Sequence, residues 1–235
     1  MSDKAEIPPA MRFSPLDRTD YPRRALIAFN LAFDRGLGNL AGCNMTFRAG
    51  ENRVFITRSG ATKSRFGKLD RDDLILADFD GNSLDGRGQL SVEYLCHTTI
   101  LKTFPEVEMV LHTHSPYATL LAARAESIPP LIDSMLGFGD TVLVPDTHKY
   151  STPGFVADIV DIMRQHPAMR TRGGCGVLYP RHGVLAVHRS PELCLDLAER
   201  IEWNAKAVVY DRLLGPSSRP LLPDHADRPD KPQSE

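Results

Sequence analysis

The chain has 235 residues, 42% of them hydrophobic and 25% charged, with a net charge of −2. This composition is typical of a globular protein, and the near-neutral charge argues against a dedicated nucleic-acid-binding protein. No apolar run approaches the roughly 20 residues that cross a bilayer, and the N-terminal residues lack the apolar region of a secretory signal, which argues against a membrane partner. Four cysteines without a CxxC pair indicate reduced thiols, so we expect a cytoplasmic protein.

Composition divides the chain into three regions. Residues 1–18 mix charge with proline and predict a flexible arm. Residues 215–235 contain five prolines and few apolar groups, and they predict a disordered tail because such a segment cannot bury enough surface to offset its ordering entropy. Between them we find no linker or repeat, so residues 19–214 are predicted to form a single domain.

Helix-like and strand-like segments alternate along this domain. Leu26, Phe29 and Phe33 recur at helical spacing, with Asp20 as the expected cap and Gly36 at the end. The further expected elements are, in chain order, a hairpin at 44–57, a strand at 74–78, a helix at 91–103, a strand at 109–114, a helix opened by Ser115 and Pro116, a strand at 141–145, a helix at 153–165, strands at 176–180 and 183–188, and a helix at 191–214. The alternation predicts an α/β layered fold, and the hairpin indicates that its sheet is not purely parallel.

The sharpest local signal is the pair His112 and His114. Residues two apart in a strand point to the same face, so both imidazoles face one side and can share a metal ion. Ser-Pro follows at once, which places the pair at the C-terminal end of a strand, where α/β folds open their ligand crevices. The alternative is a pair of surface histidines.

A catalytic zinc site needs a third protein ligand. His182 is the best candidate, because it lies at a corner between two apolar strands and the following Gly183 permits a close backbone approach. His148, in a polar loop, is the second choice. The alternative for His182 is a turn residue hydrogen-bonded to the backbone.

Glu93 and the loop at 57–66 are the other candidates. Glu93 is either a carboxylate in the first turn of a helix that Ser91 caps or a general base beside a metal-bound substrate. In the loop, Ser59 and Gly60 can present a hydroxyl and backbone N–H groups to an anion, to which Asn44 can add a contact. The cations available for charge-assisted contacts are Arg58, Lys63 and Arg65, and the alternative is a solvated basic loop.

Read together, these motifs resemble the class II aldolase/adducin family, in particular its L-fuculose-1-phosphate aldolase-like members. The resemblance rests on blocks that occur in the family's order, namely GCNMTFR (42–48), ITRSG (56–60), LSVE (90–93), and HTHSPYAT (112–119) with RHGVLAV (181–187). The acidic residue lies about 20 residues before the HxH pair, as it does in the family. The resemblance covers about residues 20–214.

The resemblance implies a single-domain, three-layer α/β fold with a central, mostly antiparallel sheet and helices on both faces. It implies a homotetramer with active sites at subunit interfaces and a small, anionic substrate. The cofactor would be zinc, or another divalent metal such as Mn, Co or Fe, held by His112, His114 and His182. Glu93 would be the acid/base. The residues that correspond to the family's phosphate contacts are Asn44, Ser59, Gly60 and Ser91.

The chain departs from the family pattern at several positions. Val92 replaces the second serine of the serine-serine-glutamate block, and Arg58 replaces the proline of the ITPSG loop. Asp133 stands roughly where L-fuculose-1-phosphate aldolase has an acid tyrosine, and no tyrosine follows Leu214. Because Val92 removes a phosphate contact and arginine pairs well with carboxylates, we expect a carboxylate-bearing substrate to be accepted at least as readily as a sugar phosphate.

The function expected first is a metal-dependent carbon–carbon lyase that performs aldol cleavage of a sugar-phosphate-like substrate through a metal-stabilised enediolate. The nearest alternative is a decarboxylase of a hydroxy- or keto-acid. A dehydratase or an epimerase of a sugar phosphate follows, and then a non-catalytic adducin-like scaffold. Retention of all three histidines argues against the scaffold, and glutamate rather than aspartate at position 93 argues mildly against the epimerase.

Overall fold

One seven-stranded sheet organises the computed structural model, which describes residues 20–215. The strands lie in the order β3 (Leu74–Asp78), β2 (Arg53–Thr57), β1 (Asn44–Gly50), β4 (Met109–Thr113), β7 (Gly183–His188), β6 (Cys175–Tyr179) and β5 (Val142–Leu143). All neighbouring strands are antiparallel except β5 and β6. This confirms the mostly antiparallel sheet. The expected arm and all but the first residue of the expected tail lie outside the described residues.

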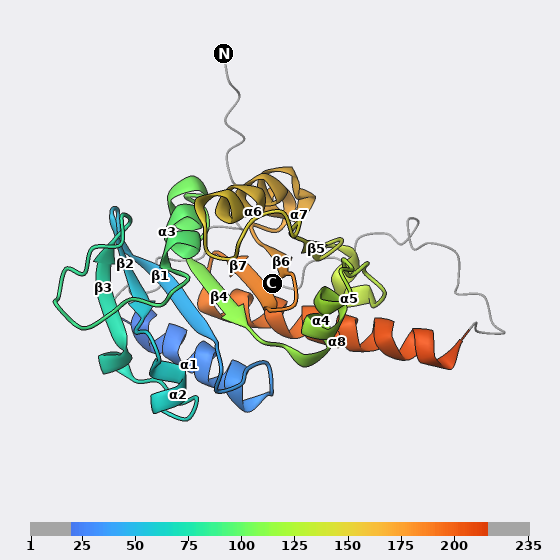
Figure 1. The fold of residues 1–235 in the computed structure, drawn as a ribbon, viewed down its shortest axis with the longest axis horizontal. Helices are drawn as coiled ribbons and strands as arrows, with labels where there is room; N and C mark the ends of the chain where they lie inside the picture. The colour runs from blue at the N-terminus through green and yellow to red at the C-terminus, as the bar shows by residue number, and fades with distance from the viewer. Residues whose placement is uncertain (1–19, 216–235) are drawn as a thin grey trace, which may run out of the picture.

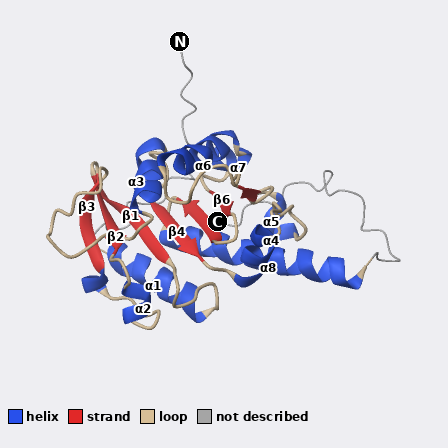
Figure 2. Cartoon of the chain, in the orientation of Figure 1, coloured by secondary structure: helices blue, strands red, loops and turns tan. Residues whose placement is uncertain are grey.

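Helices cover both faces of the sheet and make three layers (Figures 1 and 2). One face packs against α1 (Tyr21–Asp34), α4 (Pro116–Ala123), α5 (Asp133–Leu136) and α8 (Pro191–Leu214). The other packs against α3 (Tyr94–Thr103), α6 (Pro153–Gln165) and α7 (Pro167–Thr171). A short helix, α2 (Ala61–Ser64), and a 3₁₀ turn, η2 (Arg71–Asp73), connect β2 to β3. Each face of the sheet therefore has its own apolar core, as a layered α/β fold requires.

Strand β4 lies in the centre of the sheet, and all five of its residues are buried. Met109 and Leu111 belong to the core under α1 and α8, whereas Val110 belongs to the core under α3 and α6. Since side chains alternate along a strand, His112 lies on the α3 side of the sheet. The apolar run of β4 therefore determines which face carries its first histidine.

Three expected elements differ from the structure. Helix α3 begins at Tyr94 rather than near Ser91, because the Ser91 N–H bonds to the Thr57 carbonyl and keeps the chain extended beside β2. The side chain of Asp20 does not cap α1 and instead pairs with Arg23. The strand expected at 141–145 is reduced to β5, because the Thr141 backbone pairs with Ile128 and a proline at 145 has no N–H to donate.

Two observations bear on the class of protein. The four cysteines are free and buried. Among the described residues, no helix combines the length and the apolar character needed to cross a bilayer.

We expect Phe47→Ala to lower the free energy of unfolding by about 3–5 kcal/mol, because its ring is fully buried in the core between β1 and α1 and its loss leaves a cavity. Chemical denaturation measures this change. Phe66→Ala is the control, since that ring is 76% exposed and its removal should cost less than about 0.5 kcal/mol.

Candidate functional site

Three histidines meet at one end of the β4–β7 pair. The register sets Thr113 opposite Val184, so the residues that flank these strands, His114 and His182, lie close together. The ring centroid of His112 lies 4.9 Å from that of His114 and 5.0 Å from that of His182. One nitrogen from each ring falls within 4.8 Å of the others. The sequence predicted the first two as a pair and His182 as the best candidate for the third ligand, and the strand pairing brings the three together.

Hydrogen bonds orient two of these rings. His112 Nδ1 donates to the Val184 carbonyl at 3.0 Å, and His114 Nδ1 donates to Asn39 Oδ1 at 3.2 Å. Their Nε2 atoms are buried without a hydrogen-bond partner in the described part of the chain. An orphaned, buried acceptor indicates a missing ligand. Neutral imidazoles whose other nitrogen is held by an acceptor are the usual ligands of zinc, so the cluster fits a divalent cation.

Burial keeps these imidazoles neutral. Desolvation lowers the pKa of His112 and His114, and it lowers the pKa of His182 to about 4, with a further contribution from His114. Neutral imidazole is the form that binds metal. The three rings therefore need no deprotonation near neutral pH before they bind a cation.

Two glycines make room for the cluster. A Cβ atom at Gly42 would lie 2.4 Å from His114 Cε1, and one at Gly183 would lie 2.3 Å from the Thr113 carbonyl oxygen and 2.9 Å from His112 Cε1. All three distances are shorter than van der Waals contact. The glycine of the GCNMTFR block thus lies directly against a candidate metal ligand.

Glu93 lies beside the histidines and is 1% exposed. Its Oε2 is 3.8 Å from His112 Nε2, its Oε1 is 3.9 Å from His182 Nε2, and Asn44 Nδ2 donates to Oε2 at 2.6 Å. Burial raises its pKa to about 8, an effect that the Asn44 hydrogen bond partly opposes. Its side chain makes no capping bond to α3, so a role as an ordinary helix-start carboxylate has no support in the structure.

Tyr150 is a neighbour of Glu93 that sequence reasoning missed. Its hydroxyl donates to Glu93 Oε1, and its ring centroid lies 4.5 Å from that of His182. It comes from the loop between β5 and α6, and the adjacent Ser151 Oγ donates to the Val92 carbonyl at 3.1 Å. No pattern in the sequence marks this tyrosine, because only tertiary structure brings its loop to the cluster.

Two expected residues lie away from the cluster. Asp133 opens α5 and lines a separate cavity of about 400 Å³ together with Arg172 and Arg200. His148, the second choice for a ligand, pairs through Nδ1 with Asp158 at 2.8 Å.

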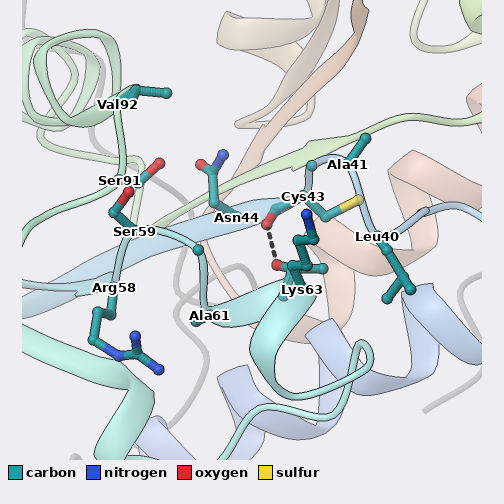
Figure 3. A pocket seen from close by; sticks show the side chains of 13 residues that line it. Leu40, Ala41, Cys43, Asn44, Arg58, Ser59, Ala61, Lys63, Ser91 and Val92 are labelled. Carbon is teal, nitrogen blue, oxygen red and sulfur yellow. Dashed lines mark hydrogen bonds between the residues drawn. The ribbon is translucent and has the colours of Figure 1, made fainter.

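A cavity of about 540 Å³ (Figure 3) is lined by Asn44, whose side-chain amide also donates to Glu93 Oε2. It is lined by the residues expected to bind an anion, which are Asn44, Arg58, Ser59, Gly60 and Ser91. Asn44 pairs with His112 across β1 and β4, so this anion pocket and the histidine cluster share one wall. The structure therefore brings the sequence-predicted site residues together except Asp133, His148 and Arg65.

The two arginines of the loop at 57–66 form ion pairs with the buried Asp73. Arg58 Nη2 and Arg65 Nε both lie 3.0 Å from carboxylate oxygens of Asp73, which is 1% exposed. Arg65 does not line the cavity. Asp73 engages both guanidiniums, but Arg58 and Lys63 still line the cavity, so the expected acceptance of a carboxylate-bearing substrate stays a prediction.

We expect Gly42→Ala to reduce the metal content of the protein severalfold while leaving the fold intact, because the added methyl group displaces His114. Elemental analysis after zinc loading, with circular dichroism as the check on folding, measures the effect. Ala41→Ser changes the neighbouring exposed residue and should retain the metal. Full metal content in Gly42→Ala would contradict a ligand role for His114.

Comparisons with known proteins identify a family and several similar proteins. A family model, the Class II Aldolase and Adducin N-terminal domain, matches residues 24–209. Methylthioribulose-1-phosphate dehydratase from Methylococcus capsulatus is 47% identical over 79 residues, which are 34% of this chain and 37% of the relative. The protein of the same name from Pseudomonas fluorescens is 34% identical over 107 residues, 46% of this chain and 50% of the relative. These matches span half or less of the curated relatives.

Among solved structures, an L-fuculose 1-phosphate aldolase superposes with a TM-score of 0.73 at 22% sequence identity, over 88% of this chain and 92% of that one. This likeness extends over the whole layered fold described above. Since the family model covers nearly all of the described domain, the resemblance seen in the motifs is confirmed, and the chain belongs to the class II aldolase and adducin family.

Proposed function

We propose that this protein is a divalent-metal-dependent lyase that removes water from a phosphorylated ketose. The observation that carries the proposal is the buried Glu93 carboxylate, less than 4 Å from two histidines of the cluster and in contact through Asn44 with the wall of the anion pocket. A base, a cation site and an anion site at this spacing suit a substrate that carries a carbonyl group and a phosphate.

The sequence motifs favour aldol cleavage, but the named relatives support dehydration instead. The relatives at 47% and 34% identity are named as dehydratases, whereas the aldolase at 22% identity supports the fold alone. Aldol cleavage of the same class of substrate is the second candidate. Mass spectrometry after incubation with methylthioribulose 1-phosphate tests the choice, because dehydration removes one water and aldol cleavage gives two fragments. An unchanged substrate would contradict both.

His112, His114 and His182 would hold the cation through their Nε2 atoms. Three neutral imidazoles suit zinc and also accept Co, Fe or Mn, and they leave a coordination position open for substrate. When bound, the cation supplies a Lewis acid for a carbonyl oxygen and a positive charge that favours the carboxylate form of Glu93.

Glu93 is the proposed acid/base. In a dehydration, its carboxylate takes a proton from the carbon next to the carbonyl, and the protonated carboxyl then gives this proton to the hydroxyl that leaves from the following carbon. Asn44 and Tyr150 each donate a hydrogen bond to one of the two carboxylate oxygens and so fix its orientation. Burial excludes water from the group and strengthens these contacts.

We also propose a cytoplasmic homotetramer with active sites at subunit interfaces. Support comes from the family resemblance and from the apolar surface of the second half of α8, where Trp203 is 63% and Leu213 is 74% exposed. Exposed large apolar side chains on one helix are typical of an interaction surface. Light scattering of the purified protein tests the assembly.

We expect Glu93→Gln to keep the fold and the metal but to lower the rate about 10²–10⁴-fold, because the amide retains the shape of the carboxylate and cannot accept the proton. Turnover and metal content are measured on the same sample. A fully active variant would show that Glu93 is not the acid/base.

We expect Tyr150→Phe to lower kcat about 10- to 100-fold, the usual worth of a hydrogen bond to a charged group, with KM and metal content unchanged. The phenylalanine ring retains the contact with His182. Tyr150→Leu removes that contact as well and is the comparison for ring packing. An unchanged kcat in Tyr150→Phe would rule out a role for the hydroxyl.

A further inference from the structure

We propose that Lys63 makes the anion pocket selective for doubly charged phosphate esters over singly charged anions of similar shape. The proposal deepens the proposed function, because it assigns the residue that recognises the substrate phosphate. Lys63 does not belong to the motifs on which the family resemblance rests. Three observations support the proposal: the position of Lys63 in the pocket, the charge of the residues that line the pocket, and the valine at position 92.

The position of Lys63 is fixed by the residue before it. Thr62 Oγ1 donates to the Cys43 carbonyl at 2.7 Å, which ties α2 to the segment that enters β1 (Figure 3). Lys63 lines the pocket, and Figure 3 shows its ammonium group beside Cys43, with Val92 on the opposite side of Asn44. Lys63 therefore lines the same pocket as Ser59 and Asn44.

The charge of the pocket is unbalanced. No aspartate or glutamate stands among the described residues that line it, whereas Arg58 and Lys63 do. Arg58 is paired with Asp73, but Lys63 forms no ion pair with any acid within residues 20–215. Lys63 is thus the cation with charge left to offer a ligand.

Val92 lacks the hydroxyl that the family pattern has at this position, so the charge of Lys63 is expected to compensate for the missing phosphate contact. Val92 is 68% exposed and offers an anion no hydrogen bond from its side chain. A lysine ammonium is a compact point charge that favours phosphate, whereas bidentate recognition of a carboxylate needs an arginine fork. A phosphate monoester has a second pKa near 6 and carries nearly two charges above neutral pH, so a point charge distinguishes it from a singly charged sulfate ester.

The test compares methyl phosphate with methyl sulfate, which match in shape and differ in charge. Calorimetry at about pH 8 measures the affinity of both anions for the zinc-loaded full chain. We expect Lys63→Met to weaken methyl phosphate about tenfold and methyl sulfate by less than about threefold, in line with the loss of one charged contact. Lys63→Arg should retain most of the affinity, and metal content should be unchanged in both variants.

Lys68→Met is the matched control. It removes the same charge five positions along the chain, where the ammonium pairs with Asp34 outside the pocket, so both affinities should stay within about twofold of the wild type. The proposal is overturned if Lys63→Met binds methyl phosphate as the wild type does, if both anions weaken equally, or if the wild type does not discriminate between them. The proposed function is tested by a different outcome. If methyl phosphate binding depends on Lys63 but the enzyme does not convert ketose phosphates, the proposed function is wrong and the role of Lys63 stands.

Discussion

The antiparallel pairing of β4 with β7 is the constraint on which the site depends. It sets Thr113 opposite Val184, which brings the residue after one strand and the residue before the other to the same edge of the sheet. The pairing of β4 with β1 places Asn44 opposite His112 on the other side. A central strand that is buried on both faces cannot shift its register by one residue without moving His112 into the opposite core. The core therefore protects the geometry of the site.

Desolvation sets the electrostatic character of the cluster. It lowers the pKa of the imidazoles and raises that of Glu93, so the burial that keeps the histidines ready for a cation also favours a neutral acid beside them. Such a group of buried polar atoms is costly unless each atom has a partner. The orphaned Nε2 atoms of His112 and His114 show that the protein alone does not satisfy the site. A bound cation would give the two Nε2 atoms a partner and would favour the carboxylate form of Glu93.

The anion pocket shows how internal pairing removes cations from ligand binding. A count of positive residues in the loop suggests three contacts for an anion, yet the buried Asp73 engages two of the three side chains. This carboxylate is taken out of water, and it is stable in the core because two guanidiniums and a backbone N–H surround it. Arg58 and Arg65 consequently hold the loop around Asp73, whereas Lys63 lines the pocket without such an ion pair among the described residues.

The sequence by itself determined the family and the layered fold, and it predicted the three histidines, Glu93 and the anion loop as candidate site residues, because these depend on spacing within one strand or on motifs local to the chain. Only the tertiary structure decided which side chains meet across the sheet. Tyr150 reaches Glu93 from a loop 57 residues away, Arg58 is diverted to Asp73, and Asp133 lies at a different cavity. Such contacts follow from how separate elements pack, and a local pattern does not encode the distance between two loops.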